Sequence, residues 1–324
     1  MYALRYHEAG DPDVLQYESI DTPEPGHGEV LVEVRAASVN PVDAKIREGV
    51  DPGGPKTTGS DLAGVVVEVG DGVTTFEAGD RVFATGLHTG RFSGGSFAEM
   101  ATVPTDLLAE LSDDVSFEEG AAVSLVGVTA WRALVDHADW EPGDSVFIHG
   151  GNGGVGHIAV GLADAMGGSA VCTARPEYHD ELRKLGAEAV IDYREDDLAE
   201  SVRDATGGAD VVLDHMPDEY IEFDVDVAAM EGDIVIIAGG ETTFPATSPA
   251  RGKELDVHMM SMSNLSSHPE MPDIAPILEQ LAELVSDGRL EVVIDRTYPL
   301  EEGAEAHRAV LEESLLGKIL VVPE

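Results

Sequence analysis

Apolar and polar residues alternate along the first third of the chain, which is the period of a β-strand with one buried face. The alternation is clearest over residues 29–39 and recurs over residues 65–69 and 80–84. Turn-forming Pro, Gly and Asp residues separate these segments, as at residues 23–26 and 71–72. The pattern predicts a mostly β domain with short strands.

From about residue 120 the pattern changes to segments that are typical in turn of strands and of helices. Strands are predicted at residues 145–149, 170–173, 189–191, 211–214 and 234–238, and helices at residues 155–166 and 178–185. This alternation predicts parallel strands joined by right-handed helical crossovers. Near the end of the chain we expect helices at residues 274–287 and 303–313 and strands near residues 292–294 and 319–322.

A glycine-rich turn follows the predicted strand at residues 145–149 and opens the next helix. Gly151, Gly153 and Gly156 have the spacing G-x-G-x-x-G of a dinucleotide-binding turn. We expect Gly151 to permit the tight turn, Gly153 to let the backbone approach a pyrophosphate, and Gly156 to let helix and strand pack closely. The N-terminus of the helix offers unpaired N–H groups to phosphates. The alternative is a glycine turn that serves packing alone, which the surrounding β-α-β units disfavour.

The end of the second strand bears on the choice of cofactor. An NAD site usually places Asp or Glu there to bind the adenosine ribose, but this strand ends in Cys172, Thr173, Ala174 and Arg175. With no acid present, Arg175 is a candidate ligand for the 2′-phosphate of NADPH. Arg175 as a solvated loop residue is the alternative, with NADH as the second cofactor.

The chain is strongly acidic, since 63 Asp and Glu stand against 19 Lys and Arg and give a formal net charge of −44. Its 43% hydrophobic content is enough for a folded core and argues against disorder. Nucleic acid and anionic membrane surfaces are disfavoured as partners, because binding to either depends on Lys and Arg, which are far outnumbered by acids in this chain. Scattered acids resemble the proteins of a halophile, which stay hydrated in molar salt. A calcium-binding surface and a nucleic-acid mimic are the alternatives, but neither has its signature here.

Cysteine usage and the start of the chain indicate a cytoplasmic location. The single Cys172 excludes a disulfide framework and a multi-cysteine zinc ribbon. The first residues form no apolar signal core. The uncharged segment at residues 145–163 contains six glycines, so it is not expected to cross a membrane.

Several motifs together resemble those of the medium-chain dehydrogenase/reductase superfamily, in its zinc-free quinone oxidoreductase (zeta-crystallin-like) branch. They are Asn-Pro-Val-Asp at residues 40–43, Gly-Ser-Asp-Leu-Ala-Gly at 59–64, Gly-Val-Thr-Ala at 127–130, the glycine-rich turn, and Ile-Asp-Tyr-Arg at 191–194. The resemblance implies an α/β protein: a GroES-like β-barrel catalytic domain (1–123), a doubly wound Rossmann cofactor domain (124–266) and a C-terminal return to the catalytic domain (267–324). It also implies a homodimer or homotetramer.

The resemblance further implies roles for particular residues. Asn40 and Thr129 would lie beside the nicotinamide, and Asn40 with Lys45 would be the catalytic candidates. Lys45 stands where many relatives carry Tyr. The remaining cofactor-binding residues would be Gly153, Gly154 and Val155 at the pyrophosphate, Tyr193 near the adenosine phosphate, and Gly239 and Gly240 on the nicotinamide side. Asn40 as a buried turn residue and Lys45 as a helix-surface charge are the alternatives.

No metal is expected. Against the zinc-binding relatives, the catalytic ligand positions hold Asn40, Ser60 with Asp61, and Leu125 in place of Cys, His and Cys, and no set of four cysteines exists. Without a metal, the reaction that we expect is hydride transfer from NADPH to a quinone or an α,β-unsaturated carbonyl. Such an acceptor delocalises the negative charge that the hydride brings. The alternatives are an enoyl-thioester reductase and a non-enzymatic, crystallin-like NADPH-binding protein.

Overall fold

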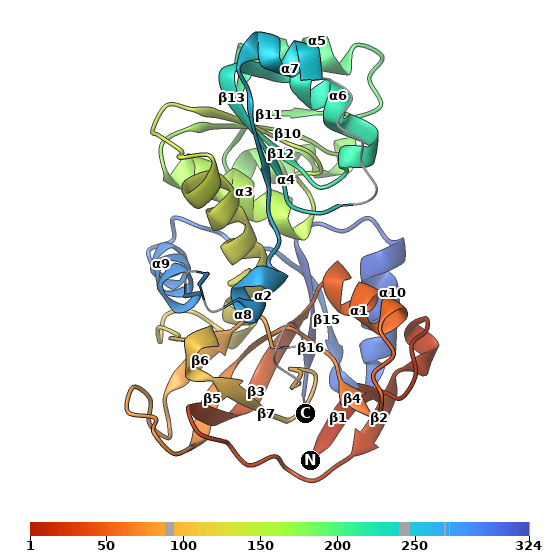
Figure 1. The fold of residues 1–324 in the computed structure, drawn as a ribbon, viewed down its shortest axis with the longest axis vertical. Helices are drawn as coiled ribbons and strands as arrows, with labels where there is room; N and C mark the ends of the chain where they lie inside the picture. The colour runs from red at the N-terminus through yellow and green to blue at the C-terminus, as the bar shows by residue number, and fades with distance from the viewer. Residues whose placement is uncertain (88–93, 240–246, 269, 272, 324) are drawn as a thin grey trace. The chain divides into compact units, whose positions relative to one another are not determined.

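The computed structural model describes residues 1–87, 94–239, 247–268, 270–271 and 273–323 (Figure 1). The chain divides into two compact units. Unit 1 contains Met1–Val128, Met262–Asp287 and Val292–Glu324, and unit 2 contains Thr129–Ser261 and Gly288–Glu291. Two separate segments from the end of the chain therefore belong to the same unit as its beginning.

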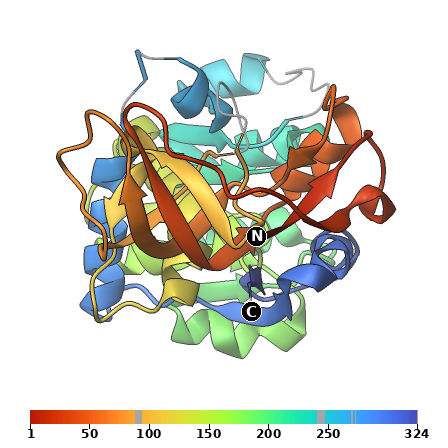
Figure 2. The same ribbon diagram turned by 90° about the horizontal axis from the view of Figure 1, so that it is seen from below.

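A seven-stranded sheet forms the centre of unit 1, where β3 lies next to β7 (Figure 2). All its pairs are antiparallel except β15–β16. The strand order is β15 (Ile294–Pro299), β16 (Lys318–Val322), β3 (Glu29–Val39), β5 (Asp61–Val69), β6 (Arg81–Ala84) and β8 (Leu108–Glu110), with β7 (Met100–Pro104) paired to β3. Because Ile319 pairs with Val39, the last strand completes the sheet that the first third of the chain begins.

A smaller sheet and several helices complete unit 1. The sheet has the order β2 (Gln16–Ser19), β1 (Tyr2–Tyr6) and β4 (Lys56–Thr57). The α-helices are α1 (Pro41–Gly49), most of α2 (Phe117–Trp131), α8 (Ser263–Ser267), α9 (Ala275–Ser286) and α10 (Gly303–Glu312), and the 3-10 helices are η1 (Pro12–Val14), η2 (Thr105–Leu107) and η5 (Leu300–Glu302). From Thr129 on, the residues of α2 belong to unit 2. Helix α1 begins at Pro41, whose fixed φ suits the first helical position.

Unit 2 contains a six-stranded sheet in which every pair of strands is parallel. The order is β11 (Ala187–Ile191), β10 (Ser169–Thr173), β9 (Ser145–Ile148), β12 (Ala209–Asp214), β13 (Ala228–Ile236) and β14 (Asp256–Met259). In chain order this is 3-2-1-4-5-6, the order of a dinucleotide-binding Rossmann sheet. The predicted α/β fold class is confirmed.

The helices of unit 2 pack on this sheet. They are a π-helical segment (Arg132–His137), α3 (Gly154–Ala165), η4 (Pro176–Tyr178), α4 (His179–Lys184), α5 (Leu198–Thr206), α6 (Pro217–Val227) and α7 (Thr247–Lys253). One core joins Phe147 and Val212 of the strands to Val202 of α5 and Ile221 of α6. Within the described residues, no helix is long and apolar enough to cross a membrane.

Most predicted strands and helices are found within a few residues of their expected positions. The main shift concerns the strand expected near residues 292–294, because β15 begins only at Ile294 and runs to Pro299. The apolar Val292 is buried but precedes the strand. Helices α1, α2, α5, α6, α7 and α8 were not predicted. Buried apolar residues line one face of α6, but charged residues between them hide that pattern in the sequence.

Candidate cofactor and active site

The glycine-rich turn joins β9, which ends at Ile148, to α3, which begins at Gly154. It is held against the end of β10 by two hydrogen bonds. The Gly150 N–H donates to Thr173 Oγ1 at 3.0 Å, and the Gly151 N–H donates to the Thr173 carbonyl at 2.8 Å. Gly150 has a φ of +64°, a conformation that glycine adopts without steric cost. The turn therefore sits where the first two strands of the sheet end.

The space around each glycine separates their roles. A Cβ on Gly151 would lie 2.5 Å from Cys172 Sγ, and one on Gly156 would lie 2.3 Å from the Gly150 carbonyl oxygen. A Cβ on Gly153 would meet nothing closer than that same oxygen, at 3.4 Å. Gly151 and Gly156 are therefore required by packing within the protein. Gly153 is not, so the space beside it is available to a ligand.

The start of α3 has the properties of an anion site. Gly153 is the N-cap residue, and the residues from Gly153 to Val155 are only half-buried. The first N–H groups of a helix have no intrahelical acceptor, and the helix dipole favours negative charge beside them. Backbone approach at Gly153 and these N–H groups together fit the pyrophosphate of a dinucleotide.

Arg175 and Tyr193 lie together at the ends of β10 and β11. Arg175 Nε donates to the Tyr193 hydroxyl at 3.3 Å, and the Arg175 side chain is exposed. Tyr193 is 39% exposed. Within the described residues Arg175 forms no ion pair, so its charge is available to an anion. The structure therefore brings together two of the predicted cofactor-binding residues.

Arg194 is a neighbour of this pair that the sequence did not single out. Its guanidinium carbon lies 5.8 Å from the centre of the Tyr193 ring. Arg194 donates to both carboxylate oxygens of Asp192, at 2.8 and 2.6 Å, and these bonds lower the pKa of Asp192 to about 2. Because Arg194 is already neutralised by Asp192, Arg175 is the better candidate for a phosphate.

Two further predicted cofactor residues also lie in unit 2. Thr129 is buried on α2, with 5% of its surface exposed. Gly239 is exposed after β13, and a Cβ there would meet no atom within 4 Å. Gly240 lies outside the described residues.

Asn40 occupies a buried polar network in unit 1. The residue is 1% exposed, and both ends of its amide are engaged. Asn40 Nδ2 donates to Asp61 Oδ2 at 2.8 Å, and Asn40 Oδ1 accepts from the Lys318 ammonium, which also donates to the Val39 carbonyl at 2.9 Å. The amide therefore connects a buried cation to a buried carboxylate.

Hydroxyl groups and a second carboxylate surround this network. Ser38 and Thr85 each donate to Asp61 at 2.6 Å, while Ser60 donates to Asp43 at 2.6 Å. The Asn40 backbone N–H donates to Asp43 Oδ2 at 2.9 Å, which fixes the start of α1. Burial raises the pKa of Asp61 to about 6 although the Lys318 charge opposes the shift, and burial lowers the pKa of Lys318.

Lys45 is placed differently from Asn40. It lies on the exposed side of α1, and no described residue forms an ion pair or hydrogen bond with it. Asn40 is at the buried start of the same helix. The structure therefore shows no contact between the two catalytic candidates.

Metal ligation is available at one cluster among the described residues. His149, Asp214 and Asp224 each offer one ligand atom, and these atoms lie within 4.8 Å of one another in unit 2. In unit 1, Asn40, Ser60 and Asp61 belong to the hydrogen-bond network above. Cys172 is buried beneath the glycine turn, and burial raises the pKa of its thiol to about 12.

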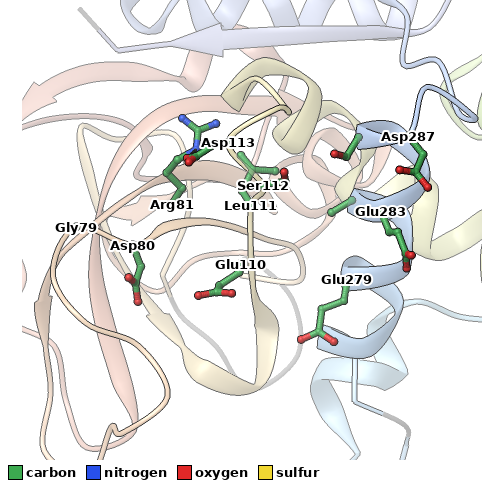
Figure 3. A pocket seen from close by; sticks show the side chains of 12 residues that line it. Gly79, Asp80, Arg81, Glu110, Leu111, Ser112, Asp113, Glu279, Glu283 and Asp287 are labelled. Carbon is green, nitrogen blue, oxygen red and sulfur yellow. Dashed lines mark ion pairs between the residues drawn. The ribbon is translucent and has the colours of Figure 1, made fainter.

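Unit 1 also contains an acidic cleft of about 660 Å³ (Figure 3). Its walls come from the start of β6, the segment after β8 and α9. Arg81 is the one basic residue of its lining and faces Asp113 at 3.6 Å. The acidic residues are Asp80, Glu110, Asp113, Glu279, Glu283 and Asp287. This cleft would repel an anionic dinucleotide, and it contains none of the predicted site residues.

Comparison with known proteins places the chain in a family. Residues 26–113 match the alcohol dehydrogenase GroES-like domain, and residues 185–321 match the zinc-binding dehydrogenase domain. The quinone oxidoreductase of Mus musculus is 33% identical over 332 residues, with 99% of this chain and 98% of the relative covered.

Solved structures agree with this placement. The Escherichia coli quinone oxidoreductase complexed with NADPH is 28% identical with a TM-score of 0.87, and all of both chains is covered. An NAD-dependent alcohol dehydrogenase is 29% identical with a TM-score of 0.88 over 99% of each chain.

A GroES-like unit combined with a Rossmann unit defines an oxidoreductase of the medium-chain type that binds NAD(P). The chain belongs to the medium-chain dehydrogenase/reductase superfamily, in its zinc-free quinone oxidoreductase branch.

Proposed function

We propose that this protein is an NADPH-dependent reductase that transfers a hydride to a quinone or an α,β-unsaturated carbonyl without a metal. The proposal that NADPH is the cofactor rests on the geometry of unit 2. Space is free beside Gly153 at the start of α3, and the exposed Arg175 stands where an NAD site would have a carboxylate. The names of the quinone oxidoreductase relatives support the acceptor.

The residues of the chain fit a bound dinucleotide. The N–H groups at the start of α3 would bind the pyrophosphate, and Gly153, Gly154 and Val155 would lie beside it. Arg175 would bind the 2′-phosphate with Tyr193 next to it. The nicotinamide, when bound, supplies the hydride. Thr129, Gly239 and Gly240 are the proposed residues on its side.

The acceptor follows from charge. Hydride addition to a quinone or enone places negative charge on an oxygen that a hydrogen-bond donor can stabilise. Oxidation of an alcohol instead requires a base or Lewis acid to remove a hydroxyl proton. Asn40 and Lys45 are the proposed catalytic residues, and the amide nitrogen of Asn40 donates to the Ser38 carbonyl at 3.5 Å besides its shorter bond to Asp61.

The test measures kcat with a small quinone and the Kd for NADPH in parallel, for the wild type, Asn40→Ala and Lys45→Ala. Lys184→Ala is the matched control, because Lys184 is an exposed lysine whose one ion pair within the described residues is with Glu181. A fall in kcat with little change in the Kd would support the proposed catalytic roles. If Asn40→Ala lowers the thermal midpoint while the folded fraction keeps full kcat, Asn40 is structural.

The same experiment also tests whether NADPH is the preferred cofactor. The wild type is expected to oxidise NADPH faster than NADH with the same quinone. No turnover with either nucleotide and any quinone or enone would overturn the proposed function.

A further inference from the structure

The ends of the two central strands of unit 2 carry a buried cluster that the proposed reaction does not use. His149 follows β9, Asp214 ends β12, and Asp224 lies in α6. Their exposed fractions are 2%, 0% and 0%. His149 Nε2 lies 2.7 Å from Asp224 Oδ1, so the imidazole and this carboxyl group share a hydrogen bond. The rings of Phe147 and Tyr220 lie 4.7 and 4.5 Å from the imidazole centre.

The charges of this cluster do not balance without an extra proton or cation. Asp214 Oδ1 accepts from the Met216 N–H at 2.6 Å, but Asp214 Oδ2 and Asp224 Oδ2 are buried and receive no N–H or hydroxyl donor from the described residues. Among the residues that the structure describes, no Lys or Arg forms an ion pair with Asp214 or Asp224. With a neutral imidazole, two ionised carboxylates would place two negative charges in the interior, which is costly.

The surroundings do not supply the missing positive charge. The other titratable groups near the cluster are Glu219 and Tyr220 of α6, Tyr193 after β11, His215 after β12, Cys172 of β10 beneath the turn, and His157 of α3. None of them carries a permanent positive charge. A proton held between the two carboxyl groups would remove one of the two negative charges from the interior.

The pKa values point to the same place for the proton. Burial raises the pKa of Asp214 and of Asp224 to about 7, and the ligand atoms of these two carboxyl groups and of His149 lie within 4.8 Å of one another. Burial lowers the pKa of His149 to about 4, so the imidazole is neutral near neutral pH. Two carboxyl groups in contact titrate as a pair, so the proton belongs to the pair.

The cluster adjoins the phosphate-binding turn from two sides. His149 directly precedes Gly150, and its backbone N–H donates to the Leu213 carbonyl at 3.2 Å. His215 directly follows Asp214, and its Cε1 lies 3.0 Å from the position of a Cβ on Gly150. A change of charge or position in the pair therefore acts on the backbone that receives the phosphates.

We propose that Asp214 and Asp224 share one proton and act as positioning residues for the cofactor, so that loss of this proton weakens NADPH binding. The inference rests on the proposed cofactor. When the proton leaves, a second negative charge is exposed to the phosphates across a buried, poorly screened region, and the hydrogen bond between the carboxyl groups is lost. Binding of NADPH above the pKa of the pair is accompanied by uptake of one proton.

The test compares NADPH binding by the wild type and Asp224→Asn between pH 6 and 9. The asparagine keeps an acceptor for His149 and a donor for Asp214 but cannot titrate. The wild-type Kd is expected to rise by on the order of tenfold over this range, and the Kd of the variant by far less. The control is Asp226→Asn, because Asp226 is an exposed carboxylate two residues further along α6 that pairs with Arg203. Asp226→Asn should keep the wild-type dependence of the Kd on pH. Because titration of the 2′-phosphate affects all three proteins equally, the comparison with this control also corrects for it.

A second measurement tests the shared proton without any nucleotide. Because the folded pKa values lie above the unfolded ones, stability is lost as the pH rises from about 4 through 7, and Asp224→Asn should remove part of this loss. Equal pH dependence of the midpoint in variant and wild type overturns the shared proton. Stoichiometric metal in the purified protein, lost in Asp224→Asn, assigns the cluster to a cation instead. A flattened midpoint profile with no NADPH binding at any pH overturns the link to the cofactor and the proposed function, but leaves the shared proton established.

Discussion

Three glycine substitutions in one turn distinguish packing from ligand binding. Gly151→Ala places a methyl group 2.5 Å from Cys172 Sγ and 2.7 Å from Cys172 Cβ. Gly156→Ala places one 2.3 Å from the Gly150 oxygen and 2.8 Å from Gly151 Cα. All of these distances are well below ordinary van der Waals contact, so the strand or the turn would have to shift in each variant. We expect overpacking to cost about 1–3 kcal/mol at Gly151 and about 3 kcal/mol at Gly156, where the obstacle is backbone.

Gly153→Ala is expected to behave differently. Its φ of −72° and ψ of 174° suit any residue, and the nearest atom to the new methyl group is 3.4 Å away. The loss of stability should stay below about 1 kcal/mol, the scale of an N-cap change. If a pyrophosphate lies against this backbone, the methyl group displaces it, and the Kd for NADPH should rise at least tenfold, about 1.4 kcal/mol.

The assay is thermal unfolding followed by circular dichroism, together with titration of each variant with NADPH. One kcal/mol corresponds to a shift of roughly 2–4 °C for a chain of this size class. Gly252→Ala is the control, because a Cβ on this exposed residue of unit 2 meets nothing within 4 Å. Unchanged NADPH affinity in Gly153→Ala would show that no pyrophosphate lies against Gly153, and a loss of stability equal to that of Gly156→Ala would show that Gly153 is required by packing.

Three further predictions follow from single features. Arg175→Ala should raise the KM for NADPH, with a loss of about 1.5–3 kcal/mol in binding free energy, and should leave the KM for NADH little changed. The control is Arg183→Ala, which replaces an exposed arginine of α4 and should change neither KM. Equal effects on both nucleotides would show that Arg175 does not bind the 2′-phosphate. Molar KCl should raise the thermal midpoint, because it screens repulsion within a chain of charge −44 and strengthens apolar burial; a flat or falling midpoint up to ~2 M would contradict the halophile interpretation. Lys318→Met should destabilise unit 1 by about 3 kcal/mol or more. The substitution removes the ammonium group that donates to Asn40 Oδ1 and to the Val39 carbonyl, and it leaves the buried Asp61 without the positive charge of Lys318. Because the lysine opposes the rise in the Asp61 pKa, the variant should lose stability more steeply than the wild type as the pH rises above 4, and parallel profiles would show that Lys318 does not act on Asp61.

Local patterns were sufficient to predict the elements that carry the cofactor turn. Residues 145–148 are apolar, glycines follow at fixed spacing, and small apolar residues continue into α3, so strand, turn and helix were each visible within a short window. The alternation of strands and helices predicted the parallel pairing in the sheet of unit 2, but not its strand order. Strand ends and helices with a mixed polar face were predicted less well.

The buried polar clusters could not be predicted from single segments. Lys318 reaches Asn40 only because the last strand pairs with β3, a contact across 278 residues. Asp224 reaches His149 because β9 and β12 are neighbours and α6 packs on them. One signal was present: Asp224 lies between Ile221 and Val225 on the apolar face of a helical period, where an acid is unusual.

Hydride transfer from NADPH to a quinone or enone without a metal can be tested with one set of initial rates. NADPH oxidation is measured with a small quinone, and NADP⁺ reduction with a primary alcohol, before and after treatment with phenanthroline, with zinc determined on the same sample. We expect quinone reduction that survives the chelator, much slower alcohol oxidation, and far less than one zinc per chain. Alcohol oxidation faster than quinone reduction, or activity lost together with stoichiometric zinc, would contradict this expectation.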